Sequence, residues 1–103
     1  MSASFSYKIT TENEQFTFDY SPVLGTTETI SSATCTVEVK EGTDPSPSSI
    51  KSGSPAISGS TVTQRILGGL DGVIYRLEMT ATTSVGNVYT IVGDLPVLSP
   101  INV

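Results

Sequence analysis

Histidine and tryptophan are absent from this chain, and cysteine occurs only once. Without histidine the commonest general base and the commonest metal ligand are both missing, and no Ser-His or Cys-His nucleophile pair can form. A single cysteine excludes an intrachain disulfide and cannot build a structural zinc site. We therefore expect no catalytic residues, no metal site and no cofactor, and we predict that the protein is not an enzyme.

Positive charge is also scarce. Five Lys and Arg stand against ten Asp and Glu, which gives a net charge of −5. The basic residues are scattered, so the chain lacks the basic face that a nucleic-acid binder presents to phosphates. No apolar run approaches the ~20 residues of a membrane helix, and the N-terminus has no signal-peptide pattern. We expect neither nucleic-acid nor membrane binding, and we expect synthesis in a reducing cytoplasm.

Alternation of apolar and polar residues is the dominant pattern that remains. Phe16, Phe18 and Tyr20 alternate with polar residues, and Cys35 and Val37 do so within a longer segment. This period of two is typical of half-buried strands, and Gly and Pro divide the chain into strand-sized pieces. The pattern predicts an all-β fold, an immunoglobulin-like antiparallel β-sandwich of about seven strands. A partly closed barrel is the alternative.

The same Gly and Pro residues predict the boundaries between segments. We predict an N-terminal strand or arm over residues 1–15, a sandwich over residues 16–94 and an extended C-terminal tail over residues 95–103. Cys35 falls on an apolar strand face, so we interpret it as a core residue. Tyr75 opens a strand after a glycine turn, which is the setting of a tyrosine corner.

Because we expect no catalytic or metal-binding residues, we expect the function to reside in edge strands, loops and termini, where β-sandwiches bind partners. Both ends of this chain carry apolar residues that could be buried by a neighbouring subunit. The predicted interface residues are Phe5, Tyr7, Ile9, Leu95, Val97, Leu98 and Ile101.

The segment from Phe18 to Val97 resembles a known family, the small immunoglobulin-like proteins of tailed bacteriophage virions called fiber-tail adaptor or neck proteins. The resemblance is carried by Asp19-Tyr-Ser-Pro-Val-Leu-Gly25, Glu28-Thr-Ile-Ser-Ser-Ala33, Cys35-Thr-Val-Glu-Val39, Leu67-Gly-Gly69, Gly72-Val-Ile-Tyr-Arg-Leu77 and Thr80-Ala-Thr-Thr-Ser-Val-Gly-Asn87.

The resemblance implies a non-enzymatic structural protein of the virion, present in many copies, that joins virion parts through protein–protein contacts. Its implied partners are tail, neck, fiber or capsid proteins, and a homo-oligomer is expected in the assembled particle. The family has no active site, so no functional residue is carried over. A capsid decoration protein is one alternative. A carbohydrate- or ligand-binding sandwich module is another, and it would need exposed aromatics among Tyr20, Tyr75 and Tyr89.

Overall fold

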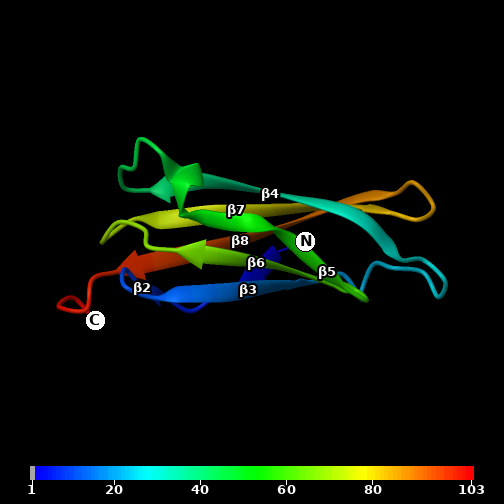
Figure 1. Cartoon of the computed structure of the whole chain (residues 1–103), viewed down its shortest axis with the longest axis horizontal. Helices are drawn as coiled ribbons and strands as arrows, with labels where there is room; N and C mark the ends of the chain where they lie inside the picture. The colour runs from blue at the N-terminus through cyan, green and yellow to red at the C-terminus, as the bar shows by residue number, and fades with distance from the viewer. Residues whose placement is uncertain (1) are drawn as a thin grey trace.

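The computed structural model describes residues 2–103, with side chains described from Phe5 onward, and Met1 lies outside the described residues. The body is elongated, with extents of 47 × 22 × 22 Å (Figure 1). A 3₁₀ turn, η1 (Pro47–Ile50), interrupts the strands, and within residues 2–103 no helix is long and apolar enough to cross a membrane. The strands are β1 (Ser2–Ser4), β2 (Lys8–Ile9), β3 (Asn13–Asp19), β4 (Ile30–Glu41), β5 (Lys51–Ser58), β6 (Thr61–Leu67), β7 (Ile74–Thr83) and β8 (Val88–Leu98).

Two sheets pack face to face. The first has the order β1-β8-β7-β4, with β2 also on β8, and the second has the order β3-β6-β5. Both β1 and β2 run parallel to β8, so together they act as one interrupted strand and the sandwich has seven strand positions. The prediction of an all-β sandwich of about seven strands is therefore confirmed. The immunoglobulin-like assignment within that class stays a prediction.

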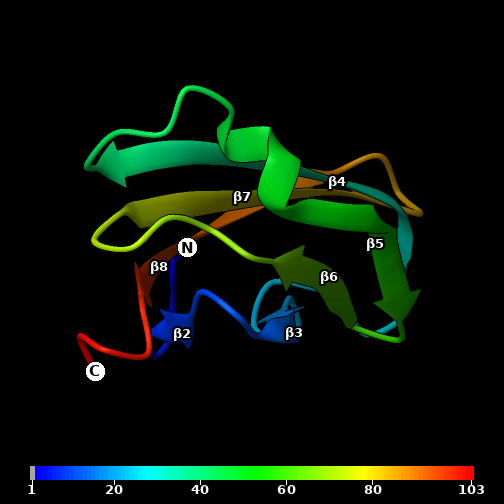
Figure 2. The same ribbon diagram turned by 60° about the vertical axis from the view of Figure 1, so that its left-hand side comes forward.

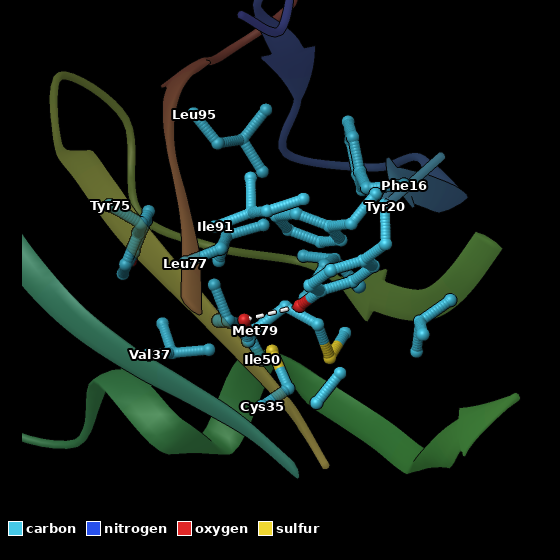
Figure 3. Packing of buried hydrophobic residues seen from close by; sticks show 14 of the residues in the cluster. Phe16, Tyr20, Cys35, Val37, Ile50, Tyr75, Leu77, Met79, Ile91 and Leu95 are labelled. Carbon is cyan, nitrogen blue, oxygen red and sulfur yellow. Dashed lines mark hydrogen bonds between the residues drawn. The ribbon is translucent and has the colours of Figure 1, made fainter. Parts of the chain in front are cut away.

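The core lies between the sheets and is built by the alternating residues of β3, β4, β6, β7 and β8 (Figure 3). The side chains with no exposed surface include Phe18, Tyr20, Val62, Ile66, Tyr75, Leu77, Met79, Leu95 and Val97. Each aliphatic or aromatic side chain buried in this way contributes roughly 1.5–3 kcal/mol. Tyr20 also satisfies its phenol inside the core, because the hydroxyl donates to the carbonyl of Met79, which is the dashed line in Figure 3.

The N-terminal segment belongs to the sandwich. Phe5 lies edge-on to the Phe16 and Phe18 rings, with centroids 5.1 and 5.3 Å away. The Lys8 side chain has no exposed surface. Its Nζ donates to the carbonyls of Gly68 (2.6 Å) and Ile9 (2.9 Å), and burial lowers the pKa of Lys8 below its ordinary value. These contacts join β1 and β2 to the first sheet.

The C-terminal boundary differs from the prediction. Strand β8 continues to Leu98, with Leu95 opposite Tyr75, so residues 95–98 are not an extended tail. Pro96 lies inside this strand, although proline cannot donate to a ladder. The Val97 N–H donates to Val73, so Pro96 occupies the alternate position, where an N–H would point away from β7. Leu95 and Val97, which the sequence predicts as interface residues, are both fully buried in this chain's own core.

Candidate docking surfaces

The chain ends in an ordered turn that holds an apolar side chain in solvent. The Asn102 N–H donates to the Ser99 carbonyl (3.0 Å), which closes a β-turn with Pro100 at its second position. Both carboxylate oxygens of Asp71 fix this turn, since Oδ1 accepts from the Ser99 N–H (2.8 Å) and Oδ2 from the Asn102 Nδ2 (2.6 Å). Ile101 occupies the third position of the turn and is 89% exposed.

The turn between β7 and β8 has a similar construction. The Gly86 N–H donates to the Thr83 carbonyl (3.0 Å), and a positive φ of 87° at Gly86 lets the chain return into β8. Val85 stands at the third position of this turn and is 66% exposed. The turn is fixed by Glu28, as Asp71 fixes the C-terminal turn.

Glu28 reaches the hairpin from the segment that joins β3 to β4. Its Oε2 accepts from the Thr83 hydroxyl and from Asn87 Nδ2 (3.0 Å), and its Oε1 accepts from the Gly25 N–H (2.9 Å). The hydrogen bonds from Thr83, then from Gly25 and Asn87, hold the pKa of Glu28 below its usual value. Each of the two turns is therefore held by one carboxylate that belongs to a different segment of the chain.

The two turns lie at opposite ends of the long axis (Figures 1 and 2). We call the end with the β7–β8 turn and the β3–β4 segment the hairpin end. The end with residues 99–103 and the β6–β7 segment is the C-terminal end, and it also exposes Leu70 (47%) and Val103 (62%). Each end thus presents at least one apolar side chain on a hydrogen-bonded turn.

Charge is distributed unevenly along the outer face of the first sheet. One cross-strand row aligns Glu38, Arg76 and Asp94. Asp94 accepts from Lys40 (2.6 Å) and from Arg76 (3.3 Å), and these contacts, led by Lys40, hold the pKa of Asp94 below its usual value. The two cross-strand rows nearest the β7–β8 turn have no charged side chain. One row aligns Ser32, Thr82 and Val88, and the other aligns Thr34, Thr80 and Thr90. Together with Val85 in the turn, these six residues form what we call the hairpin surface.

Tyr75 and Cys35, the two residues with predicted structural roles, both lie in the core. The Leu70 N–H donates to Tyr75 Oη (2.9 Å), and this hydroxyl donates to Asp44 Oδ2 (2.7 Å), so Tyr75 links the β6–β7 and β4–β5 segments. Burial raises the pKa of the Tyr75 phenol to about 12. Cys35 is 4% exposed, and burial raises the pKa of its thiol to about 11.

The predicted interface residues do not form one surface. Tyr7 is 49% exposed and Ile101 is the most exposed of the set, whereas Phe5, Ile9 and Leu98 are partly buried. Val85 and Val88 at the hairpin end are not among the residues that the sequence predicts. The sequence does contain an indication for Val85. A large apolar residue between Ser84 and Gly86, in a predicted turn, does not stabilise the turn itself and therefore points to a contact outside it.

Neither a pocket nor a cluster of three acidic or Cys side chains suited to a metal ion occurs in the part of the chain that the structure describes. The candidate docking surfaces are therefore the two fixed apolar turns and the two uncharged rows of the first sheet nearest the β7–β8 turn.

Comparison with known proteins identifies the family. The family model described as podophage GP4 fiber-tail adaptor protein gp77 matches residues 8–92. The chain belongs to this family of phage fiber-tail adaptors. Membership confirms the resemblance seen in the sequence and is consistent with a structural protein of the virion. No curated protein sequence matches the chain. The matched residues of this fiber-tail adaptor include the β7–β8 turn and end before the C-terminal turn.

Proposed function

We propose that this chain is a non-enzymatic adaptor that joins a tail fiber to the phage tail through protein–protein contacts at its two ends. The observation that carries the proposal is the family match over residues 8–92. The placement of the two fixed turns supports it, since a connector needs one attachment surface at each end of a rigid body. The strands run along the 47 Å axis and form that body.

The apolar turns supply contacts whose geometry is set before binding. Because Asp71 and Glu28 already fix the two turns, a partner does not have to order them, and the entropic cost of binding falls. Full burial of one exposed Ile or Val contributes roughly 1.5–3 kcal/mol, well short of the ~8 kcal/mol of a micromolar complex. Each end therefore needs further contacts, which Leu70 and Val103 supply beside Ile101, and Val88 supplies beside Val85.

Other features of the adaptor belong to the same proposal. We propose that several copies assemble around the tail as a homo-oligomer, without nucleic-acid or membrane contacts. Synthesis in the host cytoplasm accords with the single buried cysteine, which needs no oxidising compartment.

Reconstitution from purified parts tests the function. Tails and fibers purified from particles that lack this protein are mixed with and without it, and the fiber that sediments with the tail is measured. Co-sedimentation is expected only when the adaptor is present. Ile101→Asp and Val85→Asp should each weaken attachment to one component and leave the other attached, because the C-terminus and the β7–β8 turn lie at opposite ends of the body (Figure 1). Equal fiber attachment in the absence of the protein would contradict the proposal.

A further inference from the structure

The edges of the two sheets differ in how far they are open to another strand. The edges are β4 and the short β1 and β2 in the first sheet, and β3 and β5 in the second. An edge strand has backbone N–H and C=O groups that its own sheet leaves unpaired, and an extended segment of another protein can bond to them and continue the sheet. Such an addition needs an edge that is long, regular and uncovered.

The edges β4 and β5 are both obstructed. They lie along the same flank of the sandwich, where η1 packs beside β4 (Figure 2). Lys51 Nζ, from β5, donates to the Cys35 carbonyl of β4 (2.7 Å) and so occupies an acceptor of that edge. Strand β5 contains Pro55, which has no N–H, and its pairing with β6 is irregular between Ser52 and Ala56. The edges β1 and β2 are only three and two residues long.

Strand β3, on the opposite flank, is open along its whole length (Figure 2). It pairs one-to-one with β6 over Asn13–Asp19, without an irregularity. The Tyr20 N–H donates to the Ser60 carbonyl in the same register, so the even-numbered residues of β3 bond to β6 and the odd-numbered residues face away. The N–H and C=O groups of Gln15 and Thr17 therefore point out of the sheet. In the part of the chain that the structure describes, these groups have no hydrogen-bond partner.

The surroundings of this open edge are acidic. Glu12, Glu14 and Asp19 lie on β3 or directly before it, and all three are exposed. Burial lowers the pKa of the nearby Lys8, whereas the charges of Glu12 and Glu14 raise it, so Lys8 already lies within the field of these two carboxylates. A segment that binds along β3 is therefore favoured when it carries positive charge.

This chain has no unengaged cation with which a second copy could supply that charge. All five Lys and Arg side chains lie within the described residues, and each donates to an acceptor of its own chain. Lys8 is bound by the carbonyls of Ile9 and Gly68, Lys51 by that of Cys35, Arg65 by the side chain of Asn13, and both Lys40 and Arg76 by Asp94. A second copy also has a net charge of −5, so its approach to the acidic edge is opposed.

We propose that an extended, basic segment of one of the two virion proteins that the adaptor joins adds to β3 as a further strand of the second sheet. This inference rests on the proposed function and adds the binding mode and the charge of one partner. The segment's backbone bonds to the free groups of Gln15 and Thr17, and its Lys or Arg side chains lie beside Glu14 and Asp19. Because β3 runs along the long axis, the segment lies on the flank between the two ends (Figure 1).

The first test removes a backbone donor from the open edge. The affinity of the full-length protein is measured for purified tails and, separately, for purified fibers. Thr17→Pro deletes an N–H that β6 does not use, and it should weaken binding to one component by about tenfold or more because the partner's carbonyl loses its donor. Thr17→Val is the matched control, since it also loses the contact between the Thr17 and Thr63 hydroxyl oxygens (3.1 Å) but keeps the N–H. It should bind both components as the unmodified protein does. Urea unfolding establishes that both variants are folded.

The second test reverses one charge and leaves the backbone intact, so it decides the matter even if Thr17→Pro does not fold. Glu14→Lys should weaken binding to the same component by about threefold or more. Glu41→Lys makes the same change in net charge at an exposed residue of β4, on the opposite flank, and should change both affinities by less than about twofold. The affinity of the unmodified protein for that component should fall as NaCl rises from ~0.1 to ~0.5 M.

Each contrary result points to a different failure. If the unmodified protein binds neither tail nor fiber, the proposed function fails. If it binds both and the folded Thr17→Pro or Glu14→Lys variant binds equally well, the function stands and strand addition at β3 is overturned. Equal weakening by Thr17→Val would show that the side chain makes the contact and would also overturn strand addition. If sedimentation equilibrium of the protein alone shows a dimer that Thr17→Pro or Glu14→Lys dissociates, β3 joins two copies and the basic partner is wrong.

Discussion

Replacing Tyr75 by Phe removes one hydroxyl and two hydrogen bonds that hold the C-terminal end together. Oη accepts from the Leu70 N–H at 2.9 Å and donates to Asp44 Oδ2 at 2.7 Å, and the residue has no exposed surface. A neutral hydrogen bond contributes about 1 kcal/mol and one to an ionised group about 1.5–3 kcal/mol. Leu70 and Asp44 retain some access to water, which offsets part of the loss. We therefore expect a decrease in the free energy of unfolding of about 2 kcal/mol.

Urea unfolding followed by far-UV circular dichroism measures this change, and thermal unfolding should show a decrease in Tm of about 10 °C. Asp44→Asn keeps an oxygen acceptor without the charge and should lose less than Tyr75→Phe. Tyr89→Phe is the matched control on a partly exposed tyrosine and should change the free energy of unfolding by less than about 0.5 kcal/mol. If Tyr75→Phe unfolds at the unmodified protein's midpoint, the hydroxyl does not stabilise this end and the reasoning is refuted.

Three further predictions concern the core. Gly93→Ala places a methyl group against the Phe5 ring, so the ring must shift from its packed position, and urea unfolding should show a loss of about 1–3 kcal/mol; an unchanged midpoint would contradict this packing. Burial raises the pKa of Tyr20 and of Tyr75 to about 12 from the ordinary 10.0, so stability should be complete below about pH 10 and decline as the pH rises toward 12. Urea unfolding across this range tests the sign, and a flat profile would show that neither phenol is held neutral. The Cys35 thiol, with its pKa raised to about 11, should react with a thiol reagent at about pH 8 only as fast as the protein unfolds, and immediate labelling of folded protein would place it outside the core.

Much of the fold could be predicted because strand patterning is local. Cys35 and Val37 alternate with polar residues, and the structure buries both between the sheets. The end of β8 could not be read in this way. Whether Pro96 ends a strand depends on whether its missing N–H would face β7, and that is set by the register of Val97 against Val73, more than twenty positions away in the chain.

The candidate site was predicted less well than the fold. Ile101 is predicted as an interface residue because it is apolar and lies near the chain end, whereas its exposure depends on the hydrogen bonds from Ser99 and Asn102 to Asp71. Leu95 carries the same apolar signal and is fully buried. Composition and position along the chain do not separate two such residues, because the sheet pairing decides which of them faces the core.

By itself, the sequence determined the all-β class, the absence of histidine chemistry and the resemblance to phage adaptors, since each depends on residue types and their local order. Only the tertiary structure decided that two turns lie at opposite ends and that each is held by a carboxylate from another segment. Glu28 and Thr83 are 55 positions apart. The charge-free rows of the first sheet likewise exist only once β4, β7 and β8 pair in their register. These features come from contacts between distant segments. A local sequence pattern does not indicate which distant segment will provide the hydrogen-bonding or strand-pairing residue.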